Sequence, residues 1–362
     1  MIFSRTSHNS AALICIALLN VYLFYFYSPT AEIETKGSLT RVATNIKSFP
    51  SNNVPPKYTC DMMKSFDTLS YPQINHLRRS LMMHDAKCYK KHISKFVNAF
   101  EERIGLQHIM LHIPKAGGTS VCRQVKKENK LSLSKEAREE NCWKDSFCPL
   151  WCGCTSVKPT TCSKIEQWDE DFLMNENYLD DFCADRSYSV LIREPVKRAM
   201  SHTNHFLDFV NKGHMKGTKN MLLSLVQANY LTWSLSVYPA FKKDKSVDVR
   251  HYEPSEKDLI IAKRRLMQMD YILDLSHENT SCRAKLLRYL KIENEIGHDN
   301  SAGGGGGSSY TKDFHKSHLK SMNALDIELY EYATRLIDMD CSFYEIVGTE
   351  ITSKEQQTKT LL

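Results

Sequence analysis

The sequence has no internal repeat and no large excess of charge of either sign. The missing repeat excludes a fibrous protein. The 48 Lys and Arg residues against 42 Asp and Glu residues leave a net charge of +6, which suits an anionic ligand but not a nucleic-acid-binding tail. With 42% hydrophobic and 25% charged residues, the 362-residue chain has an ordinary globular balance, which excludes a wholly disordered chain and a polytopic membrane protein.

One long apolar run lies near the N-terminus. Residues 11–27, AALICIALLNVYLFYFY, contain no charged side chain. At about 1.5 Å per residue the run reaches about 25 Å, near the lower limit for crossing a bilayer. Bulky aromatic residues stand where a cleaved signal peptide, the alternative, would have small ones. Arg5 and no acid precede the run, so we expect a type II anchor with residues 1–10 cytosolic and everything after Ser28 translocated.

The 12 cysteines are too few for a miniprotein built on disulfides, in which cysteine exceeds about 8–10%. Eleven follow the apolar run, where an oxidising lumen would allow disulfides, and five of these lie within residues 142–162. The five lack paired CxxC spacing, and no His lies between Ile113 and Ser201, so disulfides are favoured over the alternative, a zinc site. Because eleven is odd, at least one cysteine is free or pairs between chains, which leaves an oligomer open. Asn279 is the only glycosylation sequon.

Composition divides the translocated part into three segments. Residues 28–57 are rich in Ser, Thr, Asn and Pro, which predicts a stem; residues 58–348 read as one globular domain, and residues 349–362 as a flexible tail. Three apolar runs have strand length, at residues 107–113, 187–192 and 271–275. Helical patterns follow the first two runs and precede the third, where Ser255 and Asp258 form a capping box. The alternation predicts an α/β fold with a mainly parallel sheet covered by helices on both faces.

A glycine turn follows the first predicted strand. It reads PKAGGTS over residues 114–120, and a helix can begin at Thr119 or Ser120. The N–H groups at such a helix start form a nest for anions, the hydroxyls add donors, and Lys115 adds a full charge. This is not a Walker A loop, because Lys115 precedes both glycines. The turn is therefore a candidate phosphate cradle, with a solvated glycine turn as the alternative.

A second basic motif follows the next predicted strand. Arg193, Glu194 and Pro195 join this strand to a helix, in which Ser201 lies about two turns further on. The Arg193 guanidinium can present a planar fork to a phosphate. Because ligands bind at the carboxyl ends of parallel strands, Lys115 and Arg193 are expected at one rim of the sheet. A surface loop that pairs Arg193 with Glu194 is the alternative.

Together, HIPKAGGTS and YSVLIREPVKRAMSH resemble the paired nucleotide-binding motifs of the Golgi carbohydrate sulfotransferases, and weaker similarity extends over about residues 107–346. The resemblance implies a P-loop-like α/β fold and the sulfuryl donor 3′-phosphoadenosine 5′-phosphosulfate (PAPS). It implies that the 5′-phosphosulfate is held by the loop residues Pro114, Lys115, Ala116, Gly117, Gly118, Thr119 and Ser120. It also implies that Arg193 and Ser201 grip the 3′-phosphate.

The resemblance further implies the reaction and its location. A glycan hydroxyl would attack sulfur in line, and 3′-phosphoadenosine 5′-phosphate (PAP) would leave while Lys115 neutralises the bridging oxygen. The enzyme would be a single-pass Golgi membrane protein with a luminal catalytic domain. Its partners would be the glycan acceptor and the Golgi membrane, without nucleic acid or metal.

The general base is where this sequence departs from the family pattern. Many relatives carry a His base between the two motifs, and this stretch has none. Among the carboxylates of residues 166–181, Glu176 is favoured because relatives often show a similar Asn-Glu pair. His112, on the strand itself, is interpreted as buried support, whereas His202 and His205 are candidates for facing the acceptor.

Three other functions stay open at this point. A sulfotransferase with a protein-tyrosine or small-molecule acceptor would carry the same nucleotide motifs. A luminal nucleotide kinase is disfavoured by the position of Lys115, and a non-catalytic glycan- or nucleotide-binding relative is allowed by the missing His. Trp233 stands where relatives often carry Arg, which puts an acceptor or cofactor contact there in doubt.

Overall fold

The fold is described here from a computed structural model. It describes residues 58–128, 131–133, 142, 162–165, 167, 169–176, 178, 181–211, 227–244, 252–277, 280–292, 296 and 313–361. The predicted anchor, the stem and Asn279 lie outside this set. No helix within these ranges is both long enough and apolar enough to cross a membrane.

Four parallel strands form one sheet in the order β2-β1-β3-β4. They are β1 (Gln107–His112), β2 (Phe172–Asn175), β3 (Arg186–Ile192) and β4 (Tyr271–Asp274). In register, Met110 lies opposite Met174 on one side and Ser189 on the other. The chain leaves β1 in one direction to reach β2 and returns past β1 to form β3, so the topological switch point lies between β1 and β3, where parallel α/β folds bind ligands.

The expected α/β class and three of the strands are confirmed. Strand β2 was not anticipated, because its three apolar residues stand between acidic groups and are too few to show a strand pattern. Its place beside β1 matters for the site, because the residue that follows it is Glu176.

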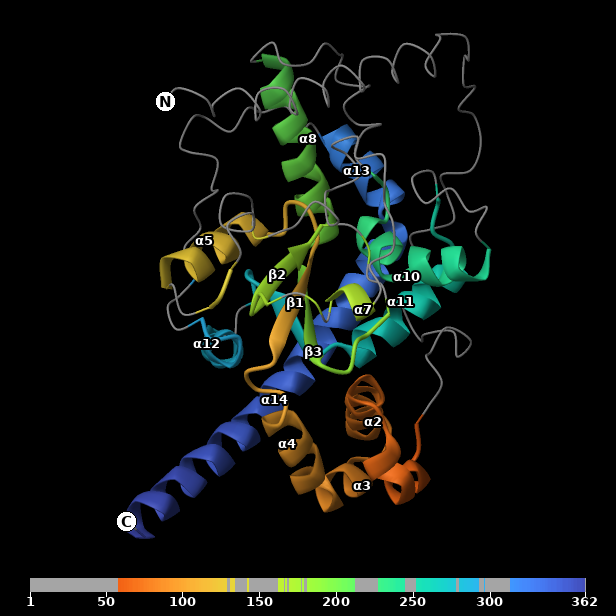
Figure 1. The fold of residues 1–362 in the computed structure, drawn as a ribbon. Coiled ribbons are helices and arrows are strands. Elements are labelled where there is room, and N and C mark those ends of the chain that lie inside the picture. Colours follow the sequence, from red (N-terminus) through yellow and green to blue (C-terminus); the bar gives the residue numbers. More distant parts are fainter. Residues whose placement is uncertain are drawn as a thin grey trace, which may run out of the picture.

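Helices lie on both sides of this sheet (Figure 1). The N-terminal ones are η2 (Cys60–Thr68), α2 (Tyr71–His84), α3 (Ala86–Lys91) and α4 (Ile93–Glu101). Those of the central region are α5 (Gly118–Glu128), α7 (Cys162–Ile165), α8 (Pro195–Asn211), α10 (Tyr230–Lys243) and α11 (Glu256–Gln268). The last three are α12 (Thr280–Tyr289), α13 (Asp313–Met322) and α14 (Ala324–Leu361).

Local signals explain several helix starts. The predicted capping box is present at α11, where the Asp258 carboxylate accepts from the backbone N–H and the hydroxyl of Ser255 at 2.8 and 2.6 Å. Helices α5 and α8 follow the two predicted turns. The helical backbone of α14 continues through residues 349–361, the segment that the sequence assigns to a tail, and its end projects beyond the body of the domain (Figure 1).

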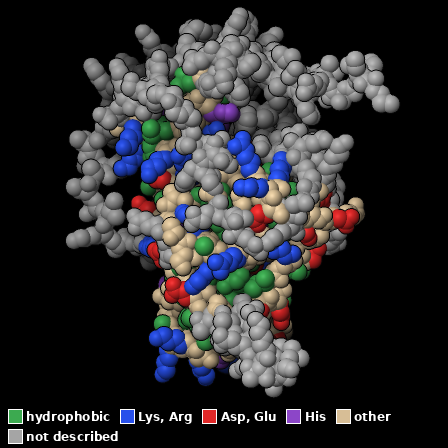
Figure 2. Space-filling view, turned by 90° about the vertical axis from the view of Figure 1, so that its left-hand side faces the viewer, with side chains coloured by type: hydrophobic (Ala, Val, Ile, Leu, Met, Phe, Trp, Pro, Cys, Tyr) green, Lys and Arg blue, Asp and Glu red, His purple; other side chains and the backbone are tan. Residues whose placement is uncertain are grey.

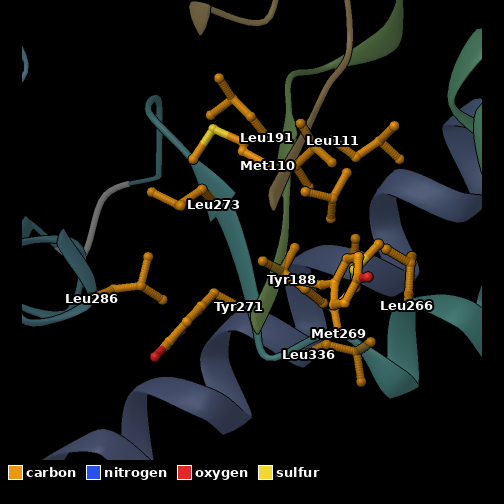
Figure 3. Packing of buried hydrophobic residues seen from close by; sticks show 14 of the residues in the cluster. Met110, Leu111, Tyr188, Leu191, Leu266, Met269, Tyr271, Leu273, Leu286 and Leu336 are labelled. Atoms are coloured by element: carbon orange, nitrogen blue, oxygen red, sulfur yellow. The ribbon is translucent and has the colours of Figure 1, made fainter. Parts of the chain in front are cut away.

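The core lies where the sheet meets these helices. The residues labelled in Figure 3 include Met110, Leu111, Leu191 and Leu273 from β1, β3 and β4, and Leu266, Leu286 and Leu336 from α11, α12 and α14. All of them are buried. A fully buried side chain of this kind contributes about 1.5–3 kcal/mol relative to an exposed one, so this cluster holds the strands at fixed positions under the site.

Buried charges fasten the N-terminal helices to this core. Arg79 of α2 forms an ion pair with Asp340 of α14 at 2.5 Å, and its Nη1 donates to three carbonyl oxygens at the end of α11. Arg103 pairs with Asp270 at 2.9 Å, and Asp270 also accepts from the backbone N–H of Tyr188 in β3 at 2.7 Å. These contacts join α2 to α14 and to the end of α11, and they join the segment after α4 to β3 through Asp270.

Disulfides join four cysteine pairs within the described ranges: Cys60–Cys88, Cys122–Cys142, Cys162–Cys183 and Cys282–Cys341. The two ends of the cysteine cluster, Cys142 and Cys162, each bond to a partner outside it, so neither offers a thiolate to zinc. The Cys122–Cys142 bond fastens the segment after α5 to the helix that starts at the glycine turn. Cys148, Cys152 and Cys154 lie outside the described residues.

Candidate functional site

The two basic motifs meet at the carboxyl edge of the sheet. Lys115 follows β1 by three residues, and Arg193 is the first residue after β3. Arg193 Nη1 donates a hydrogen bond to the backbone carbonyl oxygen of Lys115 at 2.9 Å. The expected shared rim is therefore present, and it lies at the topological switch point.

Arg193 does not pair with Glu194. The Glu194 carboxylate instead accepts from the backbone N–H groups of Val196 and Lys197, at 3.0 and 2.7 Å, and so caps the first turn of α8. Because these N–H groups occupy the Glu194 carboxylate, the Arg193 guanidinium remains available at the rim. Apart from the bond to Lys115, no acceptor for that guanidinium is found among the residues that the structure describes.

The glycine turn has an unusual backbone and close neighbours. Lys115 has a φ of 68° and Gly117 a φ of 109°. A Cβ added at Gly117 would lie 2.8 Å from Leu275 Cδ1, and one added at Gly118 would overlap the ring of His112. Both glycines are therefore required by close approach of neighbouring side chains, and Gly117 also by its backbone angle.

The start of α5 offers fewer anion-binding donors than the sequence predicts. The backbone N–H of Gly118 already donates to His112 Nε2 at 3.1 Å. For the N–H groups of Gly117 and Thr119, the described part of the chain supplies no acceptor. Since the first N–H groups of a helix have no partner within it, these two remain as donors for an anion, next to the Lys115 ammonium.

Glu176, the favoured base, lies at this same rim. As the first residue after β2 it stands beside the end of β1, and its Oε1 is 2.6 Å from His112 Nδ1. His112 and Glu176 are 5% and 7% exposed. The two atoms are close enough for an ion pair, although the ring N–H does not point straight at the oxygen. His112 is thus buried support, as the sequence indicates.

A residue that the sequence analysis missed contacts the backbone of Glu176. The Tyr230 hydroxyl, at the start of α10, donates to the backbone carbonyl oxygen of Glu176 at 2.7 Å. Helix α10 is itself positioned by Asp326 of α14, whose carboxylate accepts from the N–H groups of Leu231 and Thr232 at 2.9 and 2.8 Å. The sequence carries no local signal for these contacts, because the partners are far apart in the chain.

The charges at the rim influence one another. Burial lowers the pKa of the Lys115 ammonium, the nearby Arg193 lowers it further, and Glu176 opposes both. Two cations beside one carboxylate leave an excess of positive charge in a partly buried place. An anion bound there would relieve the repulsion between Lys115 and Arg193.

The histidines after the second motif differ in exposure. His202 is buried and stacks on Phe206, with ring centroids 4.7 Å apart. Burial lowers its pKa well below the usual value, and Arg198 and Lys115 add to this effect. A buried neutral His202 does not fit the expectation that it faces an acceptor, whereas His205 and Ser201 are partly exposed on α8.

The other sequence candidates are placed elsewhere. Trp233 is fully buried and packs against Tyr178 and Tyr230, at centroid distances of 5.9 and 5.2 Å, so it is a core residue. Among the carboxylates, Asp171 accepts from the Ser132 N–H and Asp181 pairs with Lys242. Glu166 and Asp180 lie outside the described residues.

The surface beyond the rim carries charges of both signs. On the face shown in Figure 2, groups of Lys and Arg side chains alternate with acidic and apolar ones in the described part. Neither a scan against protein-family models nor a search of curated proteins finds a match to this chain. The functional assignment therefore depends on the residues at the rim.

Proposed function

We propose that this protein is a sulfotransferase that moves the sulfuryl group of PAPS to a hydroxyl of a glycan. The observation that carries the proposal is the meeting of Lys115, Arg193 and Glu176 at the carboxyl edge of β1, β3 and β2, beside the open N–H groups of α5. Two cationic groups, one on each side of the switch point, suit a substrate with two anionic ends. The resemblance of both motifs to those of carbohydrate sulfotransferases supports the same assignment.

The donor PAPS would be a substrate of this site. The N–H groups of Gly117 and Thr119 with the Lys115 ammonium offer donors for the 5′-phosphosulfate. The Arg193 guanidinium and the partly exposed Ser201 hydroxyl offer donors for the 3′-phosphate. The P-loop-like character of the fold is part of this proposal.

In the proposed reaction, the acceptor oxygen forms a bond to sulfur while the bond from sulfur to the 5′-phosphate oxygen breaks. The hydroxyl proton passes to the Glu176 carboxylate, and PAP leaves with the bond's electron pair. Lys115 offsets the charge that develops on the leaving oxygen. Because its ammonium is partly buried, water screens this interaction less than it would screen the interaction of an exposed lysine.

The place of action is proposed from the sequence. Residues 11–27 would anchor the chain in the Golgi membrane, with the catalytic domain in the lumen. The disulfides support an oxidising compartment, since such bonds are rare in the cytosol. A luminal glycan is then the acceptor to which the enzyme has access.

Two measurements on the full chain test the proposal. Calorimetric titration with PAP should show binding at one site, and labelled sulfate should pass from PAPS to a member of a panel of defined glycans. A tyrosine peptide and a simple phenol in the same panel test the other acceptor classes. Transfer to only one of these two would show that it, and not a glycan, is the acceptor. PAP binding without any transfer would leave a non-catalytic relative, and the absence of PAP binding would refute the proposal.

A further inference from the structure

The imidazole of His112 lies between the two functional parts of the site. On one side its Nε2 accepts the Gly118 N–H at 3.1 Å, and on the other its Nδ1 lies 2.6 Å from Glu176 Oε1. The ring is buried, and a Cβ at residue 118 would overlap it. No step of the proposed reaction uses this ring, although it contacts both the anion loop and the proposed base.

The contact with Gly118 determines where the ring carries its proton. A backbone N–H can only donate, so Nε2 must be the bare nitrogen. A neutral imidazole then carries its hydrogen on Nδ1, on the edge that faces the Glu176 carboxylate. The opposite tautomer would set two N–H groups against each other at Gly118, and two lone pairs against each other at Glu176.

The same argument determines which role Glu176 Oε1 takes toward the ring. A protonated Glu176 could donate to Nδ1 only if Nδ1 were bare, and the ring would then have no hydrogen on either nitrogen. Glu176 Oε1 therefore faces the ring N–H as an acceptor and carries no proton itself. Oε1 faces the ring, so in the proposed reaction the other carboxyl oxygen would receive the proton.

We propose that His112 is a positioning residue that holds the Glu176 carboxylate with one ring nitrogen and the anion loop with the other. That Glu176 is the base and that the loop binds an anion both rest on the proposed function. The ring also withholds the Gly118 N–H from an anion, so the anion would be bound by the flanking N–H groups of Gly117 and Thr119 and by Lys115. The orientation of the base and the shape of the donor site would thus depend on one side chain.

The tautomer can be tested without any nucleotide. The full chain is labelled with ¹⁵N-histidine, and long-range proton–nitrogen correlations are recorded, with His112→Gln used to assign the His112 signals. We expect a protonated Nδ1 and a bare Nε2. A bare Nδ1 with a protonated Nε2 would overturn the inference, whatever the protein binds.

Two substitutions can separate the two sides of the ring. In His112→Asn the amide nitrogen takes approximately the place of Nδ1 and can still donate to Glu176, while the acceptor for Gly118 is lost. In His112→Gln the longer side chain can place its amide oxygen near Nε2 and accept from Gly118, while the donor to Glu176 is lost. His112→Leu removes both and keeps most of the volume.

We expect the two variants to fail in opposite ways. His112→Asn should weaken PAP binding about tenfold and keep most of kcat, since one hydrogen bond to the loop is lost. His112→Gln should keep PAP affinity and lose roughly 100-fold in kcat, since the base is misplaced. His112→Leu should lose both. Glu176→Gln serves as the matched control: it should lose kcat without losing PAP affinity.

A purely structural His112 predicts another pattern. The three variants would then lose kcat and PAP affinity together, or lose neither, and either result would overturn the proposal. Thermal unfolding of each variant shows whether it is folded, and the nitrogen spectrum of the unaltered chain decides the tautomer if none of them is. Absence of PAP binding by the unaltered chain would instead refute the proposed function.

Discussion

Arg193 offers the sharpest test of the donor site, because it lies at the rim without belonging to the loop. In Arg193→Ala the guanidinium is removed, and with it the 2.9 Å hydrogen bond to the Lys115 carbonyl oxygen. The neighbouring Glu194 uses its carboxylate to cap the first turn of α8, and the substitution leaves that cap intact. The change should therefore act on the rim and leave the fold unchanged.

The magnitude follows from the contacts that are lost. A charge-assisted hydrogen bond to a phosphate contributes about 1.5–3 kcal/mol, which corresponds to a roughly 10- to 150-fold change in affinity. The repulsion that lowers the pKa of Lys115 is also removed, so Lys115 becomes easier to keep protonated. We therefore expect a higher KM for PAPS with kcat reduced much less. Arg193→Lys should recover only part of the affinity, because an ammonium lacks the planar fork.

The assay is transfer of labelled sulfate at several PAPS concentrations, together with calorimetric titration by PAP. Lys197→Ala is the matched control, since this exposed lysine on the same helix removes one positive charge without touching the rim. If Arg193→Ala leaves KM and the PAP Kd within about twofold of those of the unaltered chain, or if Lys197→Ala changes them equally, Arg193 is not a phosphate ligand.

Three further predictions concern other parts of the molecule. Lys115→Ala should abolish labelled-sulfate transfer while thermal unfolding stays unchanged, and retained activity would contradict its role at the leaving oxygen. Gly118→Ala should lower the unfolding free energy by about 1–3 kcal/mol, because the new Cβ overlaps His112; an unchanged Tm in calorimetry would show that the loop can move. Burial raises the pKa of Asp340, but Arg79 and Arg78 outweigh burial and hold this pKa below its ordinary value of 3.8. The contribution of Asp340 to stability is therefore present above about pH 4 and is lost as the pH falls through its pKa in the folded state. Asp340→Asn should cost about 3–5 kcal/mol at pH 7 and reduce the loss of stability in acid, as urea titrations at several pH values would show.

The position of Glu176 shows what sequence reasoning could reach and what it could not. The resemblance to the carbohydrate sulfotransferase motifs suggested this residue, but nothing local placed it near Lys115, because strand β2 is too short to be recognised. Pairing of β2 with β1 brings Asn175 opposite Leu111 and so carries Glu176 to the rim. In the same way, nothing local showed that His202 is buried, on a helix against which α13 and α14 pack.

The sequence by itself determined the elements whose signals are local. Apolar runs that end in turns specify β1, β3 and β4, and a capping box specifies the start of α11. The order of the residues also determined that Lys115 and Arg193 follow strand ends and therefore share one edge of a parallel sheet.

Only the tertiary structure decided the contacts between residues distant in the chain. It paired Cys142 and Cys162 with cysteines outside their cluster, put Trp233 in the core, and set His112 between Gly118 and Glu176. The physical reason is that local patterns specify backbone conformation, whereas these contacts depend on strand order and helix packing, which are settled by burial over the whole domain.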